Sequence, residues 1–140
     1  MTGELREKGN YYNSNRQGVW VMYHDNGQLW SKQNYKNGKL DGANIGYYDN
    51  AQLMYKGNWK NGKQDGIQVG YYKNGQVADK GYWKNGEFDG AWVSYRENGQ
   101  LWHEGNWKNG KKDGVFTGYF ENGELWWIDT YKNGVLISSD

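Results

Sequence analysis

A glycine returns every 24 residues through most of this 140-residue chain, at Gly18, Gly42, Gly66, Gly90 and Gly114. The surrounding residues return with it, because the segment 54–66 (MYKGNWKNGKQDG) recurs with edits at 30–42, 78–90 and 102–114. A fixed period of this length is typical of repeat proteins, in which each unit buries its apolar face against its neighbours. The period predicts a single domain over 1–140, with a partial unit at 1–17 and full units at 18–41, 42–65, 66–89, 90–113 and 114–137.

Every full unit contains two turn signals, one near its middle and one near its end. The first is Asn-Gly at 26–27, 74–75, 98–99 and 122–123, and the second is Asn-Gly at 37–38, 61–62, 85–86, 109–110 and 133–134. Asn-Gly tolerates positive φ at both central positions, as a type I′ hairpin turn requires. Ala51 replaces the glycine once, which predicts a strained or altered turn at that position.

The segments between the turns are six to nine residues long and rich in valine, isoleucine, tyrosine and tryptophan. Segments of this length and composition favour β-strands, and the frequent glycines argue against helices. The chain is therefore expected to be all-β, an elongated single antiparallel meander of stacked hairpins with one hairpin per unit.

Period-2 alternation separates columns that hardly change between units from columns that vary. We expect the constant columns to form the core, and the glycines at 57, 81 and 105 to let neighbouring rings lie over the backbone. Strict alternation places the leucine column on the same face as the tryptophan column at 59, 83 and 107. The constant columns are Val19, Ala43, Ile67, Ala91, Val115; Val21, Ile45, Val69, Val93, Thr117; Tyr23, Tyr47, Tyr71, Tyr95, Tyr119; Leu29, Leu53, Val77, Leu101, Leu125; and Tyr35, Trp59, Trp83, Trp107, Tyr131.

The variable columns carry aromatic and long side chains of the kinds enriched at the centres of protein interfaces. If the fold required these residues, every unit would be expected to keep them, as it keeps the tyrosines. We therefore predict that they form an exposed partner-binding face, although the tryptophans could instead cover a second hydrophobic layer. The predicted binding residues are Trp20, Trp30, Tyr48, Met54, Tyr72, Trp92, Arg96, Trp102, His103, Phe116, Phe120 and Trp126.

The segment Tyr-Lys-Gly-Asn-Trp-Lys-Asn-Gly-Lys-Gln-Asp-Gly at 55–66 resembles a MORN repeat, and the interposed Tyr-Tyr-Lys-Asn-Gly-Gln at 71–76 resembles the bacterial variant form found in the YwqK family of antitoxins. The resemblance covers nearly all of residues 3–137. It implies an elongated sheet of stacked hairpins that serves as a protein-binding scaffold. Its variant branch implies neutralisation of a partner toxin. The pattern lapses towards the ends, where Gln33 and Asp129 replace a glycine.

Catalytic, cofactor and metal sites find little support in the sequence. The near P-loop segments at 57–64 and 105–112 lack the Ser or Thr that holds magnesium. The aspartates at 41, 65, 89 and 113 are isolated acids that we expect to hydrogen-bond their own turns rather than calcium. With only two histidines and no cysteine, a zinc site is not expected either. We predict no enzyme activity, no cofactor and no metal.

The formal net charge of +1 and the interspersed lysines and acids argue against nucleic acid as a partner. Peripheral binding to phospholipid membranes is one alternative function, with the turn lysines facing headgroups. A carbohydrate- or choline-binding repeat protein is a second alternative, because aromatic rings hold sugars and quaternary ammonium groups. The hydrophilic N-terminus predicts a cytoplasmic protein. An open meander also leaves two edge strands, through which self-association is conceivable.

Overall fold

The computed structural model describes residues 6–140, so the start of the partial first unit lies outside the described residues. The described chain holds no helix of the length and hydropathy that crossing a lipid bilayer requires. Its regular elements are all strands: β1 (Glu7–Tyr12), β2 (Asn15–Tyr23), β3 (Leu29–Lys36), β4 (Lys39–Tyr47), β5 (Leu53–Lys60), β6 (Lys63–Gln64), β7 (Gly66–Tyr71), β8 (Val77–Lys84), β9 (Glu87–Tyr95), β10 (Leu101–Lys108), β11 (Lys111–Lys112), β12 (Gly114–Tyr119), β13 (Leu125–Lys132) and β14 (Val135–Ser139).

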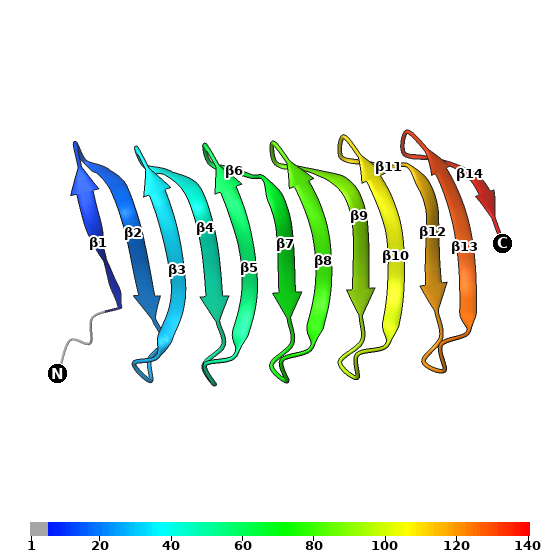
Figure 1. Ribbon diagram of the computed structural model, residues 1–140, viewed down its shortest axis with the longest axis horizontal. Coiled ribbons are helices and arrows are strands. Elements are labelled where there is room, and N and C mark those ends of the chain that lie inside the picture. Colours follow the sequence, from blue (N-terminus) through cyan, green and yellow to red (C-terminus); the bar gives the residue numbers. More distant parts are fainter. Residues whose placement is uncertain (1–5) are drawn as a thin grey trace.

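These strands form one open antiparallel sheet in which each strand pairs with the next along the chain (Figure 1). The short strands β6 and β11 pair with β5 and β10, and the chain then continues into β7 and β12. Strands β1 and β14 lie at the two ends of the sheet. The predicted all-β meander of stacked hairpins is confirmed.

The upper turns of Figure 1 are the type I′ hairpin turns that the sequence predicts. At the turn between β3 and β4, for example, Asn37 has φ 51° and Gly38 has φ 81°. The first upper turn has no Asn-Gly pair, yet Asn13 and Ser14 adopt φ 48° and 65° in the same role. Positive φ at both central positions matches the twist of the flanking strands, which fixes the register of each hairpin.

The lower turns have a different geometry, so the prediction of type I′ turns is wrong there. In the turn between β2 and β3, Gly27 has φ 82° but Asn26 does not have positive φ. The Gly27 N–H donates to the His24 carbonyl over 2.9 Å, and the His24 N–H donates to the Gln28 carbonyl over 2.8 Å. This is a three-residue loop that needs a left-handed residue only at its last position.

Ala51 adopts the left-handed conformation that glycine supplies in the other lower turns, with φ 67°. Its turn keeps the same hydrogen bonds, from the Ala51 N–H to the Tyr48 carbonyl at 3.0 Å and from the Tyr48 N–H to the Gln52 carbonyl at 2.8 Å. The turn is therefore strained, as predicted, but it is not rearranged.

We expect Ala51→Gly to raise the free energy of unfolding by about 0.5–1 kcal/mol, because relief of the left-handed strain exceeds the extra flexibility of glycine in the unfolded chain. Urea unfolding followed by tryptophan fluorescence measures this. The matched control is Gly123→Ala, where φ is +87° and an added Cβ meets no atom within 4 Å. It should lower stability by a similar amount, and no change in either variant would contradict the assignment of strain.

A β-bulge follows every lower turn and changes which side chains share a face. The pairing passes from Gly46↔Tyr55 to Tyr47↔Leu53, so Met54 is the extra residue on its strand. The same shift occurs in every unit. The leucine column consequently lies on the opposite face from Trp59, and the prediction that these two columns share a face is wrong. The extra residues are Trp30, Met54, Ala78, Trp102 and Trp126.

The register divides the side chains into an aromatic face and an aliphatic face. The aliphatic face carries the columns that begin at Val19, Val21 and Tyr23, and the first of these is largely exposed, with Val19 at 45%, Ile67 at 43% and Val115 at 49%. On the aromatic face, Trp20 and Phe116 are only 3% and 2% exposed. The prediction that the constant columns form the core is therefore wrong for the Val19 column. Within residues 6–140 the buried hydrophobic side chains are two variable aromatics, Trp20 and Phe116.

Candidate partner-binding face

The aromatic face is assembled from rings that lie directly on glycines of the adjacent strand. A Cβ added to Gly105 would lie 2.2 Å from the Phe116 ring, and one added to Gly9 would lie 2.2 Å from Trp20. Trp92 lies beside Gly81 in the same way, with an added Cβ 3.3 Å away. The prediction that a neighbouring ring covers the backbone at the glycines is confirmed for Gly81 and Gly105, but it is wrong for Gly57, which the Gln68 side chain covers.

One pair in this row reverses the pattern and explains it. Gln33 stands where other units have glycine, and the residue paired with it is the small Asn44 rather than a ring. The Gln33 Oε1 accepts a hydrogen bond from the Tyr35 hydroxyl over 3.0 Å. At this pair a larger side chain in the glycine column is matched by a smaller one in the variable column, as expected if the two positions together fill one volume.

A second row on this face follows the same rule. The Tyr55 ring lies over Gly46 and the Trp127 ring over Gly118, with an added Cβ at 2.2 Å and 2.3 Å from them. In the first unit the sizes are exchanged, because Met22 pairs with Ser31, whose exposure is 2%. In this row, too, a large side chain on one strand lies opposite a small residue on the adjacent strand.

The upper row of the aromatic face contains a stack of three rings. Phe88 stacks between Trp83 and Trp107, with ring centroids 3.9 Å and 5.3 Å apart. At the equivalent positions in the first hairpin and in the hairpin that follows β10, a cation takes the place of Phe88. The Arg16 guanidinium lies 4.2 Å from the Trp20 ring centroid, and the Lys112 ammonium lies 4.7 Å from that of Tyr131.

A ladder of hydrogen bonds runs along the lower edge of the sheet from unit to unit. The Tyr48 hydroxyl donates to the Tyr71 carbonyl over 2.6 Å, and the Tyr72 hydroxyl to the Tyr95 carbonyl over 2.7 Å. Equivalent bonds join the His24 Nε2 to the Tyr47 carbonyl at 2.7 Å and the Arg96 guanidinium to the Tyr119 carbonyl at 3.0 Å. Phe120, which cannot donate, has no following unit within the described residues. The residue in this column differs from unit to unit, but in these four units its side chain is long enough to reach the carbonyl of the following unit.

We expect Tyr72→Phe to lower the free energy of unfolding by about 1 kcal/mol, because the Tyr95 carbonyl loses its donor while the ring remains. Thermal unfolding of the two proteins measures the difference. Phe120→Tyr is the matched control and should leave stability unchanged, because it adds a hydroxyl where the ladder has no acceptor. Equal stability of Tyr72→Phe and the wild type would contradict a structural role for the ladder.

His103 lies in an aromatic cluster on the lower half of this face. Its ring centroid is 4.8 Å from Trp102, 5.8 Å from Trp127 and 6.5 Å from Trp92. The Ser94 hydroxyl lies 3.4 Å from the His103 Nδ1. Burial, and secondarily the nearby Arg96, lower the pKa of His103 from the ordinary value of 6.5. The imidazole is thus neutral at pH 7.

We expect the stability of the protein to fall as the pH drops below about 6.5, because the unfolded chain then binds a proton at residue 103 that the folded chain resists. His103→Asn should remove this contribution. The difference in unfolding free energy between the wild type and this variant should therefore shrink from pH 7.5 to pH 5.5. A difference that is constant or grows as the pH falls would contradict the lowered pKa.

The sequence predicts that the turn aspartates hydrogen-bond their own turns, but three of the four instead accept from the turn of the next unit. The Asp41 carboxylate accepts from the Asn61 N–H over 3.1 Å, and the Asp89 carboxylate from the Asn109 N–H over 3.2 Å. Asp113 accepts from Asn133 over 3.3 Å. No group of three or more histidine or acidic side chains within residues 6–140 is placed to hold a metal ion.

The twelve predicted binding residues fall into four environments. Trp20 and Phe116 are buried, so the expectation that they are exposed is wrong. Trp92 and His103 are half-buried on the aromatic face. Tyr48, Tyr72 and Arg96 are held in the lower ladder, and Met54 is half-buried at a bulge. The largely exposed members are Trp30, Trp102, Phe120 and Trp126, at 43%, 37%, 44% and 56%.

Several residues of the aromatic face were not among the predicted binding residues. Trp59, Trp83 and Trp107 lie in a column that looks constant and was assigned to the core, whereas Tyr55, Phe88 and Trp127 lie in two variable columns that alternation left unassigned. One sequence signal could have indicated the face: the glycines at 9, 81 and 105 are followed eleven positions later by Trp20, Trp92 and Phe116, whereas Gln33, which replaces the glycine, is followed by Asn44. The missed residues are Tyr55, Trp59, Trp83, Phe88, Trp107 and Trp127.

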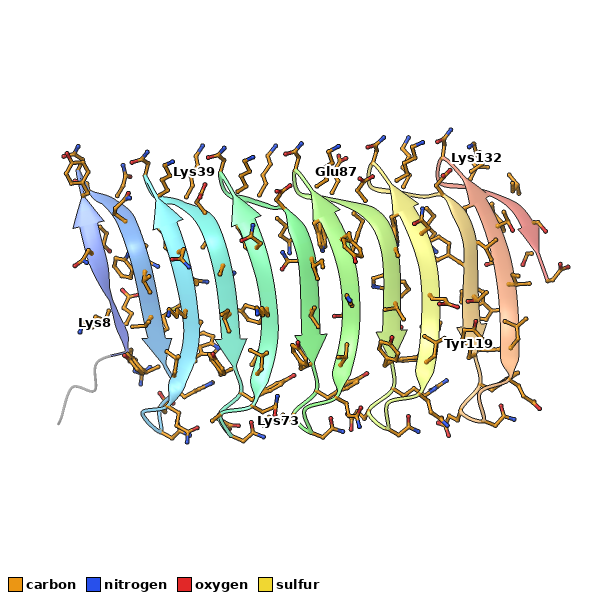
Figure 2. The ribbon with its side chains drawn as sticks, viewed as in Figure 1. Lys8, Lys39, Lys73, Glu87, Tyr119 and Lys132 are labelled. Atoms are coloured by element: carbon orange, nitrogen blue, oxygen red, sulfur yellow. The ribbon has the colours of Figure 1, made fainter. Side chains whose placement is uncertain are left out.

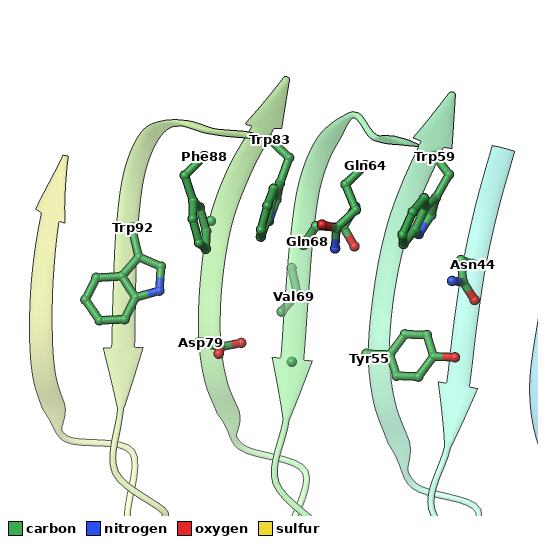
Figure 3. Close-up of a pocket in the computed structure, with 12 residues that line it drawn as sticks. Asn44, Tyr55, Trp59, Gln64, Gln68, Val69, Asp79, Trp83, Phe88 and Trp92 are labelled. Atoms are coloured by element: carbon green, nitrogen blue, oxygen red, sulfur yellow. The ribbon is translucent and has the colours of Figure 1, made fainter. Parts of the chain in front are cut away.

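A shallow groove of about 290 Å³ interrupts the aromatic face near the middle of the sheet (Figure 3). Trp59 stands on one side of it, and Trp83 with Phe88 and Trp92 on the other, while Gln64 and Gln68 lie between them. We call this the central groove. Its lining residues are Asn44, Tyr55, Trp59, Gln64, Gln68, Val69, Gly70, Asp79, Gly81, Trp83, Phe88 and Trp92.

Because the described chain forms a single sheet, both faces remain open. The accessible surface is 9076 Å². A compact monomer of 16.3 kDa would expose about 7,500 Å². The open aromatic face is thus a surface on which residue types typical of interfaces are gathered.

A family model described as a MORN repeat variant matches residues 16–37, 64–85, 88–109 and 112–133, which together make up more than half of the chain. No curated protein matches. Among solved structures, a chain of a GtfA/B complex bound to UDP and GlcNAc is similar at 11% identity with a TM-score of 0.36. That similarity covers 93% of this chain but only 24% of the other, so this chain spans about a quarter of its length.

Proposed function

The chain belongs to the family of MORN repeat variants, and on that premise we propose that it is a non-catalytic scaffold that binds a protein partner through its aromatic face. Repeats of this family generally serve as modules that bind proteins or membranes. The observation that carries the proposal is the row of tryptophan rings that no second layer of the described residues covers.

The aromatic face has the properties of an interface centre. Trp59, Trp83 and Trp107 lie at one level of the sheet, about 9.6 Å apart in successive units, because two strand spacings separate them. All three rings project from strands, and those of Trp83 and Trp107 are also held by stacking on Phe88, so little side-chain freedom is lost on binding. The finer proposal is that the partner is a toxin and the protein an antitoxin or immunity protein of the bacterial cytoplasm.

Affinity capture from the native host, followed by reconstitution with the purified partner, tests this proposal. Trp83→Arg should weaken binding at least tenfold, whereas Ile67→Arg, on the aliphatic face with 43% exposure, should leave it unchanged. Circular dichroism establishes that both variants fold. Recovery of no stoichiometric protein, or loss of binding only in Ile67→Arg, would refute the proposal.

Peripheral membrane binding is the second candidate, favoured by a row of exposed lysines along the upper edge, where Figure 2 labels Lys39 and Lys132. Glu87 interrupts the row, and the turn aspartates offset part of its charge. Each basic residue near an anionic surface contributes about 1 kcal/mol at most. The exposed lysines of this edge are Lys36, Lys39, Lys60, Lys63, Lys84, Lys108, Lys111 and Lys132.

Cosedimentation with phosphatidylcholine vesicles, with and without phosphatidylserine, decides between the candidates. Membrane binding predicts sedimentation only with the anionic vesicles, and its loss when Lys60, Lys63 and Lys108 are changed to glutamate. The same change at Lys32, Lys56 and Lys80, which share a row on the aliphatic face, is the matched control. No sedimentation with either vesicle removes this candidate.

A further inference from the structure

Four lysines on the aliphatic face lie in one line across the sheet. The strand register connects them through direct pairs, as where Lys32 lies opposite Val21 on one side and Ile45 on the other. The succession of such pairs is unbroken from β1 to β9, so the four lysines share one level of the sheet. We call them the lysine row, which consists of Lys8, labelled in Figure 2, and Lys32, Lys56 and Lys80.

The charge of the lysine row is exposed and is not neutralised on its own face. All four residues are exposed, and none of them forms an ion pair within residues 6–140. The rows directly above and below carry no acidic residue in the part of the chain that the structure describes. The next position of the row itself is Glu104, whose carboxylate accepts from the Tyr119 hydroxyl over 2.9 Å. A line of four positive charges that ends at a negative one favours an anionic ligand of limited length.

Apolar side chains surround the lysine row, so its ligand needs more than charge. A half-buried aliphatic residue lies between each lysine and the next, at Val21, Ile45 and Val69. The row above, towards the upper turns, holds the exposed Val19 and Ile67. Because acidic and apolar groups alternate in protein segments, an acidic protein segment complements this surface better than a phosphate polymer does.

The spacing of the lysine row selects the conformation of that segment. Two strand spacings, about 9.6 Å, separate successive lysines, so the four span about 29 Å. A polyproline II helix returns to the same side at every third residue, after about 9.3 Å, and falls short by only about 1 Å over three intervals. An α-helix returns after seven residues and about 10.5 Å, and it overshoots by about 3 Å over the same distance. A β-strand places every third residue on its opposite face.

We propose that the lysine row binds an acidic segment of a partner protein in the polyproline II conformation, with a carboxylate at every third residue. Each of four carboxylates would pair with one lysine, and an apolar residue beside each acid would cover the row that holds Val19 and Ile67. One exposed ion pair contributes little, so binding depends on the four pairs acting together. Glu104 would limit the segment to four acids by repelling a fifth. This inference goes beyond the proposed function, because the lysine row lies on the face opposite to the tryptophan rings.

Binding of synthetic peptides to the full chain tests the inference. The probe is Glu-Pro-Pro repeated three times and ended by a fourth glutamate. One comparison peptide has the same composition with its four glutamates consecutive in the middle, and another has glutamine in place of every glutamate. Fluorescence anisotropy of the labelled peptides reports binding at low salt. We expect weak binding of the probe, at least fivefold tighter than that of the clustered peptide, no binding of the glutamine peptide, and loss of affinity as salt is added.

Two triple variants of equal charge locate the site. The first replaces three members of the lysine row by glutamine and should weaken the probe at least tenfold. The second replaces the lysines four positions later on the same strands and should weaken it less than threefold, because turn aspartates offset the charge of that edge, as Asp113 does at 3.9 Å from Lys132. The substitutions are K32Q, K56Q and K80Q in the first variant and K36Q, K60Q and K84Q in the second.

Glu104→Lys tests the limit on length. A longer peptide, with Glu-Pro-Pro repeated four times and ended by a fifth glutamate, should bind this variant at least fivefold tighter than the wild type, and the gain for the shorter probe should be smaller. Circular dichroism establishes that the variant folds. Equal gains for the two peptides would contradict a row that Glu104 ends.

The outcomes separate this inference from the proposed function. Trp83→Arg, which should weaken the partner of the aromatic face, should leave binding of the probe unchanged. Equal binding of the probe and the clustered peptide, or equal losses in the two triple variants, overturns the inference. Binding of phosphatidylserine vesicles that the first triple variant abolishes, without binding of the probe, also overturns it, because the row would then recognise a membrane surface.

Discussion

Phe116→Ala should lower the free energy of unfolding by about 3–4 kcal/mol, the range for removing a buried aromatic ring from a packed interior. The ring is 2% exposed and lies across Gly105. Its centroid is 5.8 Å from Trp107 and 5.4 Å from Tyr131, both in edge-to-face contact. Removing it leaves a cavity between two hairpins that a single-layer sheet cannot close by repacking a second layer.

Phe120→Ala supplies the matched control, with the same residue type on the same strand-turn segment. Phe120 is 44% exposed and contacts Trp126 at a centroid distance of 5.4 Å. Its loss should lower stability by about 1 kcal/mol or less. Chemical unfolding monitored by circular dichroism gives both values. Equal losses in the two variants, or a larger loss for Phe120→Ala, would contradict the assignment of Phe116 to the interior.

Gly105→Ala should lower the free energy of unfolding by about 2–3 kcal/mol, although alanine is ordinarily the better strand residue. The added Cβ would lie 2.2 Å from the Phe116 ring, which is fixed between its neighbours. Gly57→Ala is the matched control in the unit two repeats earlier. There the nearest atoms to the added Cβ are at the end of the Gln68 side chain, which can rotate away at the cost of its hydrogen bond to the Asn58 carbonyl, so we expect a loss of about 1 kcal/mol.

A compensated double variant tests the complementarity between the two positions. Gly105→Gln combined with Phe116→Asn reproduces the pairing of Gln33 with Asn44. The double variant should be more stable than the sum of the two single losses predicts, with a coupling energy of at least about 1.5 kcal/mol. Additive losses would show that the two columns vary independently, and the explanation of the variable column would fail.

The overall architecture was predictable because its determinants are local and repeated. The Asn-Gly pairs at 37–38 and their equivalents set positive φ at two successive residues, which forces a tight hairpin wherever they occur. The 24-residue period then places every hairpin in the same environment. Lower turns such as 24–28 differ from the upper turns because they are type I turns followed by one left-handed residue. An Asn-Gly pair fits both kinds of turn, so the pair alone does not tell them apart.

The assignment of faces was not predictable by alternation alone. Each lower turn is followed by one extra residue, such as Met54. The residue before it on the strand, here Leu53, consequently lies on the face opposite to the one that strict alternation predicts. The bulge position holds tryptophan, methionine or alanine, so no residue type marks it. Strict period-2 counting therefore placed Leu53 and Trp59 together, whereas the register separates them.

The sequence analysis predicted an exposed face of aromatic side chains, but several of the residues that it assigned to this face lie elsewhere. The expectation that variable columns are exposed fails for Trp20 and Phe116, because a packed position varies freely when its partner varies with it. The expectation also fails for Tyr48, Tyr72 and Arg96, whose side chains are held in the hydrogen-bond ladder. The ladder requires a long side chain with a donor but not one particular residue type, so this column can vary. The expectation holds for Trp30 and Trp126, which are exposed.

The most direct test of this fold is the solvent exposure of the individual tryptophans. Incorporation of 5-fluorotryptophan, with assignment by single Trp→Phe variants, gives one ¹⁹F resonance per ring, and the change in shift between H₂O and D₂O reports contact with water. We expect the smallest change for Trp20, which is 3% exposed, and large changes for Trp30, Trp102 and Trp126, at 43%, 37% and 56%. A large change for Trp20 together with small changes for the other three would contradict the account.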